Sequence, residues 1–370
     1  MKNKTNIITI VSCCLVVVLL AVTFVCAPDK TISEKENRTL SQLPLFNAGE
    51  LFSGNYTAKL AEYISDQFPL RDTFVAIKAY SELALGKREN NSVIYGNDGV
   101  LISRDKTEQN RLNENLKIVK EFQNATQVSV VLSVLPRTID VFSECLPKSY
   151  STKSDNDLWQ EYYNFAQQNG IVAPDLYKPL CEQNNYYHTD HHYNTYGAYQ
   201  VYQLLGDSLG YEPMDKDFFK AEIVSDDFCG TSMRSSGFYL AKKDEITLFR
   251  YDGDTKYQIT ADEKQIELYD FSKLESTDKY AVFLGGNHAR VDIHSDDDKP
   301  KLLMIRDSFA DSIAPFLALH YDLTLIDLRY FNGNVQQLVK DENFEKVLIL
   351  ESIAEFSTTK NMSYLRMSAK

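Results

Sequence analysis

The most distinct hydropathy feature of the chain is an uncharged apolar run near its start. Residues 7–27 carry no charge, Lys2 and Lys4 precede them, and charged residues return from Asp29 onward. A helix of this length, at about 1.5 Å per residue, crosses a hydrocarbon core of about 30 Å. We therefore expect residues 1–30 to form an uncleaved signal anchor that spans the membrane once. The two lysines predict that the rest of the chain lies on the extracytoplasmic side.

Removal of this segment is the alternative interpretation. Val25-Cys26-Ala27 loosely resembles the small-x-small pattern of a signal-peptide cleavage site, which would place the cut after Ala27. The length of the apolar run, which exceeds that of an ordinary signal peptide, favours the anchor.

The next stretch is polar and rich in helix formers. Apolar side chains recur at helical spacing from Phe74 to Leu85, and Gly86 is placed to end that helix. We expect residues 31–90 to form a helical extension or stalk.

From residue 91 onward the pattern changes to strands that alternate with helices. Asn97-Asp98-Gly99 lies between two short apolar runs and predicts a hairpin turn. The spacing then predicts strands at 128–135, 171–173, 302–305, 323–326 and 347–350, and helices at 157–168, 195–209, 311–320 and 334–340. This alternation is typical of a three-layer α/β/α sandwich with a mostly parallel sheet. We expect it to fill residues 91–370, with an irregular insertion around 211–300.

Charge and cysteine content narrow the function and the compartment. The chain has a net charge of −13, which argues against nucleic acid as a partner. Three cysteines lie outside the apolar run, so at most one disulfide forms among them. We expect a bond between Cys145 and Cys181 with Cys229 free; three buried thiols are the alternative.

The candidate chemistry lies in two short segments. Asp190 and His192 form an Asp-x-His unit, in which a carboxylate can fix the tautomer of an imidazole whose other nitrogen faces a serine. Ser308 follows an apolar strand, where a strand-to-helix turn would expose its hydroxyl. Both segments follow predicted strands, and sites collect at that edge of an open α/β sheet. Alone, each residue is more simply explained as a helix cap or a buried polar group.

These segments together resemble a known family. Asp190-His191-His192-Tyr193, followed by Thr195, Gly197 and Ala198, resembles the segment that names the bacterial DHHW family, and Arg306-Asp307-Ser308-Phe309 resembles its serine block. Three further stretches look like the same family: Glu36-Asn37-Arg38, Asp66-Gln67-Phe68-Pro69-Leu70-Arg71 and Arg329-Tyr330-Phe331. The family is similar to the SGNH-like half of the alginate O-acetyltransferases, which places Asp-x-His before the serine, in permuted order.

The resemblance implies roles for individual residues. Ser308 would be the nucleophile, His192 the general base and then acid, and Asp190 the residue that orients His192. His191 would face away or pack beneath the site. Tyr193 replaces the tryptophan of the family name and would preserve its packing.

Arg306 stands where the serine block of SGNH proteins has glycine. Arginine would be strained there if the glycine serves a positive φ, and would narrow the pocket if it only permits close approach. Asn287 in Gly285-Gly286-Asn287 and the amide of Gly230 are candidate oxyanion donors. Arg306, Arg329 and Tyr330 are further candidates for oxyanion or substrate binding.

The function that the resemblance implies is O-acyl transfer, with acetyl as the group, to a cell-envelope polysaccharide at a bacterial cell membrane. It further implies a multispanning membrane O-acyltransferase as the supplier of acyl groups, and no cofactor. A carbohydrate O-acetylesterase would use the same three residues. A noncatalytic glycan-binding or complex-organising protein is a second alternative. A metal site is the third, since His188, His191, His192 and Asp190 lie within five residues and His288 or His294 would complete it.

Overall fold

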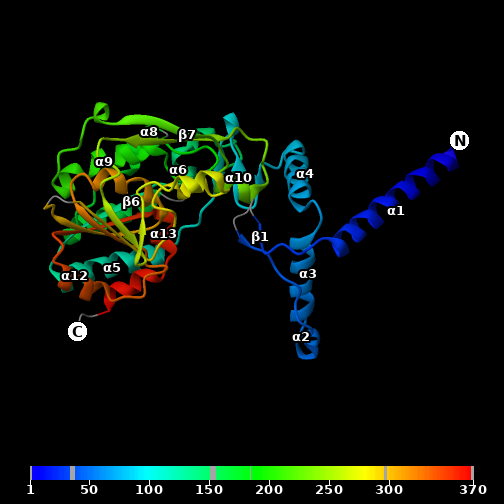
Figure 1. Ribbon diagram of the computed structural model, residues 1–370, viewed down its shortest axis with the longest axis horizontal. Helices are drawn as coiled ribbons and strands as arrows, with labels where there is room; N and C mark the ends of the chain where they lie inside the picture. Colours follow the sequence, from blue (N-terminus) through cyan, green and yellow to red (C-terminus); the bar gives the residue numbers. More distant parts are fainter. Residues whose placement is uncertain (1, 34–37, 151–155, 184, 296–297, 368–370) are drawn as a thin grey trace. The chain divides into compact units, whose positions relative to one another are not determined.

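The computed structural model describes residues 2–33, 38–150, 156–183, 185–295 and 298–367. The chain divides into two compact units, shown in Figure 1. Unit 1 comprises residues 1–87 with 237–239, and unit 2 comprises residues 88–236 with 240–370. Glu36 and Asn37 of the first N-terminal motif lie outside the described residues.

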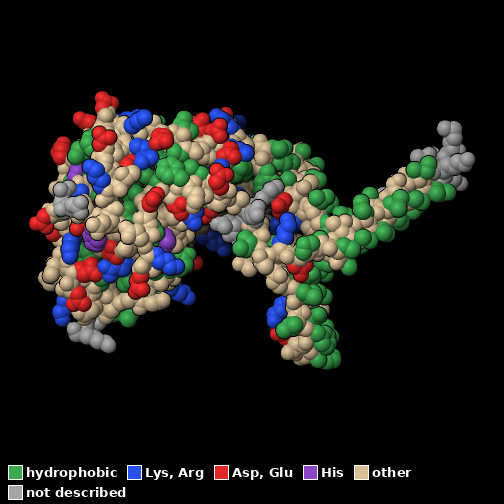
Figure 2. Space-filling view, viewed as in Figure 1, with side chains coloured by type: hydrophobic (Ala, Val, Ile, Leu, Met, Phe, Trp, Pro, Cys, Tyr) green, Lys and Arg blue, Asp and Glu red, His purple; other side chains and the backbone are tan. Residues whose placement is uncertain are grey.

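Unit 1 begins with a long apolar helix, α1 (Lys2–Cys26). Its segment Ile7–Cys26 is long and apolar enough to cross a membrane. Figure 2 shows apolar side chains along this helix. The unit continues with β1 (Ile32–Ser33), β2 (Arg38–Thr39), α2 (Ala48–Phe52), α3 (Asn55–Gln67) and α4 (Arg71–Ala84). Helix α4 ends just before Gly86, as its spacing predicts.

The Asp66-Gln67 motif holds unit 1 together internally. The Asp66 carboxylate accepts a hydrogen bond of 2.8 Å from the backbone N–H of Ser41, and Gln67 bonds to both backbone groups of Lys30. The C-terminal end of α1 contacts α3 through an edge-to-face pair of Phe24 and Tyr63, with ring centroids 5.9 Å apart. These contacts tie the residues after the apolar helix to α3.

Unit 2 is an α/β unit built on a seven-stranded mixed sheet with the order β10-β9-β11-β13-β12-β14-β6. Strands β13, β12, β14 and β6 are parallel, whereas β10, β9 and β11 extend the sheet in antiparallel pairs. The strands are β6 (Ser129–Leu135), β9 (Gln258–Ala261), β10 (Lys264–Ile266), β11 (Arg290–His294), β12 (Lys301–Arg306), β13 (Asp322–Ile326) and β14 (Lys346–Ser352). The parallel strands coincide with predicted apolar runs, while β9 to β11 come from the segment expected to be irregular.

The helices of unit 2 agree with the sequence pattern where the pattern is long. Predicted helices at 157–168 and 195–209 correspond to α7 (Asn156–Asn169) and α9 (Thr195–Leu209), the latter capped by the Asn194 side chain. The helix predicted at 311–320 is shorter than predicted, because a 3₁₀ turn (Ser308–Ser312) precedes a short α11 (Ala314–Leu317). The others are α5 (Gln109–Thr126), α6 (Thr138–Val141), α8 (Tyr177–Gln183), α10 (Thr231–Ser236), α12 (Val335–Glu342) and α13 (Ile353–Thr358).

Both faces of the sheet are buried. Alternate residues of a strand point to opposite faces, so Val130 and Leu132 of β6 enter one hydrophobic cluster and Val131 and Leu135 enter the other. Helices α5, α7, α12 and α13 contribute to the first cluster. Helices α8, α9 and α11 contribute to the second. Apolar side chains on both faces explain why these strands are continuous apolar runs.

Two smaller sheets complete unit 2. Strands β3 (Glu89–Asn90), β4 (Val93–Tyr95) and β5 (Leu101–Ser103) form an antiparallel sheet, which confirms the hairpin predicted at Asn97-Asp98-Gly99. Strands β7 (Lys220–Phe228) and β8 (Asp244–Arg250) form a second antiparallel pair.

Candidate active site

The serine lies in a tight turn at the carboxyl end of β12. Asp307 caps this turn: its Oδ1 accepts the backbone N–H of Phe309 at 3.0 Å, and its Oδ2 accepts the N–H of Ser352 at 2.8 Å. Ser352 is the last residue of β14, the neighbouring strand. The Asp307 carboxylate therefore ties the serine turn to the adjacent strand end and fixes the position of Ser308.

Hydrogen bonds to the backbone hold the Asp-x-His segment on both sides. The N–H of Tyr187 donates to the carbonyl of His192 at 3.1 Å. The half-buried Asp244 carboxylate accepts hydrogen bonds from the backbone N–H groups of His188 and Thr189 at 2.9 and 2.8 Å. Burial raises the pKa of Asp244, although these hydrogen bonds oppose the rise. Asp244 thus anchors the two residues that precede Asp190.

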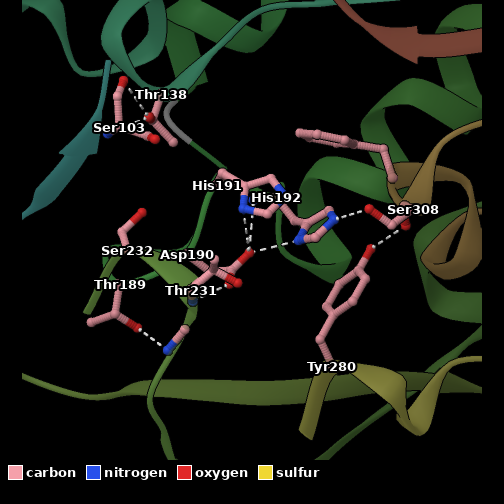
Figure 3. A network of polar contacts seen from close by, with 12 residues as sticks. Ser103, Thr138, Thr189, Asp190, His191, His192, Thr231, Ser232, Tyr280 and Ser308 are labelled. Carbon is pink, nitrogen blue, oxygen red and sulfur yellow. Dashed lines mark hydrogen bonds and ion pairs between the residues drawn. The ribbon is translucent and has the colours of Figure 1, made fainter. Parts of the chain in front are cut away.

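The structure brings Asp190, His192 and Ser308 into one hydrogen-bonded chain, shown in Figure 3. Nδ1 of His192 lies 2.6 Å from Oδ1 of Asp190, and Nε2 lies 2.8 Å from Oγ of Ser308. Burial alone would raise the pKa of Asp190, but His191, His192 and the N–H of Thr231 hold it well below its ordinary value. Asp190 is therefore ionised at neutral pH and fixes the N–H of the imidazole on Nδ1.

Gly230 lies directly against Asp190, but its backbone is already engaged. Its N–H donates to Oγ1 of Thr189 at 3.0 Å, which leaves no donor for an oxyanion and is contrary to the role predicted for it. The next N–H, of Thr231, donates to Oδ2 of Asp190 at 2.6 Å. This segment therefore orients the carboxylate.

A cavity of about 680 Å³ opens beside the serine. Its wall includes Ser308 and further hydroxyl side chains such as Ser103 and Thr231, together with charged side chains such as Arg104 and Lys106. Such a wall offers hydrogen-bond donors and acceptors to a hydroxyl-rich ligand.

His191 also lines this cavity, so the expectation that it faces away or packs beneath the site is wrong. Its ring contacts the ring of His192, with centroids 4.0 Å apart. Burial and the neighbouring His192 lower the pKa of His191, so its imidazole is neutral at pH 7.

Arg306 does not contact the cavity. It is the last residue of β12, in extended backbone, so the positive φ that would strain an arginine does not arise. Its side chain is 0% exposed and lies 3.1 Å from Asp311 and 3.8 Å from Asp327. Burial raises the pKa of Asp311 to about 7 despite this cation. The expectation that Arg306 narrows the pocket or contacts substrate is therefore not supported by its position.

The remaining sequence candidates differ in position. Arg329 lines the cavity, and its guanidinium forms a bidentate pair with the buried Asp327. Tyr330 is exposed and lies under Arg329, 5.4 Å from its guanidinium. Asn287 is exposed and is not among the residues of the cavity wall.

The histidines proposed for a metal site are dispersed. His288 pairs with Asp262 and His294 with Asp322, and the ring of His188 packs on Phe142. Within the described part of the chain, Asp190, His191 and His192 alone lie close enough to share an ion. Both ring nitrogens of His192 already make hydrogen bonds within the chain, so this cluster does not fit a metal well.

The cysteines do not form the predicted disulfide. Cys145, Cys181 and Cys229 are not joined to one another by a disulfide in the structure. Burial raises the pKa of Cys181 to about 12, so this thiol is protonated and unreactive at neutral pH.

Two tyrosines, Tyr193 of the family motif and Tyr280 outside it, hold the serine turn. The hydroxyl of Tyr193 donates to the carbonyl of Phe309 at 2.6 Å, and that of Tyr280 donates to the carbonyl of Ser308 at 3.2 Å. Tyr193 is fully buried, so the aromatic position of the family motif serves packing and also bonds the turn. Tyr280 is one of 23 tyrosines, and no local pattern distinguishes it.

The fold and site define an α/β protein with a hydrogen-bonded Asp-His-Ser chain at the carboxyl edge of its parallel strands. The model of the family described as DHHW protein matches residues 112–326. The chain belongs to the DHHW family.

The chain is similar to one curated protein in sequence and to two solved structures in fold. A probable alginate O-acetylase AlgJ of Pseudomonas putida is 25% identical over 165 residues, which are 41% of this chain and 43% of that protein. The chain thus spans less than half the length of this relative. The crystal structure of a DHHW family protein from Eubacterium siraeum is 19% identical, covers 76% of this chain and 97% of that one, and has a TM-score of 0.61. The structure of Bacillus cereus PatB1 with a sulfonyl adduct is 18% identical, covers 74% of this chain and 98% of that one, and has a TM-score of 0.62. Both solved structures share the α/β fold.

Proposed function

We propose that this chain is an O-acetyltransferase that modifies a polysaccharide of the bacterial cell envelope by way of an acyl-serine. The observation that carries the proposal is the chain of hydrogen bonds from Asp190 through His192 to Ser308, at the wall of a cavity that presents hydroxyl and charged side chains. A sequence relative named as an alginate O-acetylase supports the choice of reaction. The two-sided burial of the sheet supports the three-layer α/β/α, SGNH-like arrangement. The position of Asp190 and His192 before Ser308 in the chain supports the permuted motif order.

The proposed first step forms the acyl-serine. Nε2 of His192 takes the proton of Ser308 as Oγ attacks the acyl carbonyl carbon. The bond between that carbon and the oxygen of the leaving group then breaks, and His192 returns the proton to the leaving oxygen. Asp190 stays ionised and stabilises the imidazolium that forms between these events.

The proposed second step transfers the acyl group. An acceptor hydroxyl in the cavity loses its proton to His192 and attacks the acyl carbon, and the ester bond to Ser308 breaks as Oγ regains a proton. The backbone N–H of Ser308 makes no hydrogen bond within the part of the chain that the structure describes, which makes it the candidate donor to the oxyanion. Water in place of the acceptor would give an esterase from the same residues.

The test uses the full chain in detergent with a chromogenic acetyl ester, with and without an oligosaccharide acceptor. Ser308→Ala and His192→Ala should each lower the rate of ester cleavage by at least about a thousandfold, while the exposed Ser363→Ala retains it. Equal residual rates in all four proteins would overturn the proposal. Acetyl recovered on the oligosaccharide distinguishes transfer from hydrolysis.

We also propose that α1 anchors the chain in the cell membrane with unit 2 on the extracytoplasmic side, beside a multispanning membrane acyltransferase that supplies acyl groups. The apolar span Ile7–Cys26 supports the anchor. Protease added to intact cells should digest unit 2. Protection of unit 2 in intact cells, with digestion after lysis, would reverse the proposed orientation.

A further inference from the structure

Tyr280 contacts both the base and the nucleophile of the candidate site. Its ring stacks on the imidazole of His192, with centroids 4.1 Å apart and planes inclined by 11°. Its hydroxyl donates to the backbone carbonyl of Ser308 at 3.2 Å and shares a hydrogen bond of 3.1 Å with Oγ of Ser312. One buried side chain, from a 3₁₀ turn at Lys279–Val282, thus connects two segments that are 116 residues apart.

The stack encloses the imidazole on both sides. His191 contacts the ring of His192 at 4.0 Å, and in Figure 3 the His192 ring lies between the rings of His191 and Tyr280. Rotation of His192 about its side-chain bonds would require one of these rings to move. Because Nδ1 is also bonded to Asp190, the imidazole is held with Nε2 directed at Ser308.

We propose that Tyr280 is a positioning residue for the His192–Ser308 pair and favours the protonated imidazole. This inference rests on the proposed function, since it concerns the same serine and histidine. The face of an aromatic ring attracts a cation, so a stacked tyrosine stabilises the imidazolium that forms when His192 takes a proton. The tyrosine hydroxyl, whose pKa is raised by burial, remains a neutral donor that fixes the carbonyl of Ser308.

The other groups that act on His192 are also defined. Asp190 and His191 come from the same segment as His192. Phe309, on the serine turn, contacts the His192 ring, with ring centroids 4.7 Å apart. Asp311, on the same turn as Phe309, interacts electrostatically with His192. A change at Tyr280 leaves all of these residues in the chain, so a shift in the pH profile of serine labelling would report the loss of the stacked ring.

The experiment measures how fast phenylmethanesulfonyl fluoride labels Ser308 as a function of pH, with the full chain in detergent and intact mass as the readout. Sulfonylation needs the activated serine but neither acetyl donor nor glycan. The variants are Tyr280→Leu and Tyr280→Phe. Tyr251→Leu and Tyr251→Phe are the matched controls, because Tyr251 is also buried and donates to a carbonyl, that of Pro315 at 3.0 Å, away from His192.

We expect Tyr280→Leu to move the midpoint of the pH profile down by at least about half a pH unit and to lower the plateau rate, with no such shift in Tyr251→Leu. Tyr280→Phe should restore the midpoint, since it keeps the ring, but leave a reduced plateau, since it loses the bond to Ser308. Profiles of Tyr280→Leu and Tyr251→Leu that coincide would overturn the inference.

Two further outcomes keep the proposals separable. If Tyr280→Leu does not fold, a plateau of Tyr280→Phe equal to that of Tyr251→Phe overturns the inference on Tyr280. If the native chain is labelled no faster than Ser308→Ala, the proposed function itself fails. Labelling of the native serine with identical profiles in all tyrosine variants removes only the role of Tyr280.

Discussion

The α-carbon of Gly230 packs against Asp190 so closely that a methyl group at position 230 would lie 2.3 Å from Cβ of Asp190 and 2.5 Å from the carbonyl oxygen of Thr189. Any side chain larger than hydrogen must displace the segment that carries the carboxylate. The glycine is therefore required for the position of Asp190, in a site where its own N–H is already bonded.

Gly230→Ala should lower the rate of acetyl ester cleavage by about a hundredfold, because a displacement of about 1 Å in a catalytic group has effects of that size. It should also destabilise the fold by about 1–3 kcal/mol through overpacking. Thermal denaturation measures the second effect and steady-state kinetics the first. The neighbouring Cys229→Ala is the control, and a native rate in Gly230→Ala would contradict the geometry.

Asp190→Asn should leave the fold intact but lower kcat by between about a hundredfold and ten-thousandfold. The Asp190 carboxylate accepts hydrogen bonds from the backbone N–H and from the Nδ1–H of His192. The amide of asparagine can instead donate an N–H to Nδ1 and so stabilise the wrong tautomer of the imidazole. Nitrogen NMR of the imidazole would detect the exchanged tautomer. The control is Asp252→Asn, on the surface, which should have the native kcat. A native kcat in Asp190→Asn would exclude an orienting role for Asp190.

Asn287→Ala should leave the rate of ester cleavage within about twofold of native, as expected of an exposed residue away from the cavity wall. Removal of a true oxyanion donor costs about a hundredfold to a thousandfold in kcat. Steady-state kinetics on the chromogenic ester separates these two results. A loss of that larger size would restore Asn287 as a donor and require the loop to move on substrate binding.

Glu351→Gln should remove part of the pH dependence of stability. Burial and the nearby Asp307 raise the pKa of Glu351 well above its ordinary 4.5, and its Oε2 has no hydrogen-bond partner within the described part of the chain. The folded state therefore keeps a proton that the unfolded state releases above about pH 4.5. The free energy of unfolding falls as the pH rises from about 4.5 to the raised pKa of Glu351.

The slope from one such group is about 1.4 kcal/mol per pH unit. Urea denaturation at pH 4 and pH 8 should show a smaller loss of stability in Glu351→Gln than in the native protein. The exposed Glu345→Gln should keep the native slope. An unchanged slope in Glu351→Gln would show that this carboxyl is ionised in the folded state.

Much of the parallel part of the fold follows from local sequence. The apolar runs that became β6, β12, β13 and β14 are buried on both faces, and such a run is typical of a strand in the interior of a parallel sheet. Helix α9 begins at Thr195, as predicted, because the Asn194 side chain accepts two backbone N–H groups of the first turn. The helix predicted at 311–320 is reduced to α11 because a tight turn capped by Asp307 occupies Ser308–Ser312.

The chemistry divides in a similar way. The sequence by itself determined which segments hold the carboxylate, imidazole and hydroxyl, because the Asp-x-His spacing and the strand before Ser308 are local features. Only the tertiary structure decided the surroundings of those groups. Arg306 and Asn287 lie away from the cavity, His191 lies on its wall, and Tyr280 lies against His192. Contacts between residues distant in the chain depend on packing across the sheet edge, which no local pattern of side chains encodes.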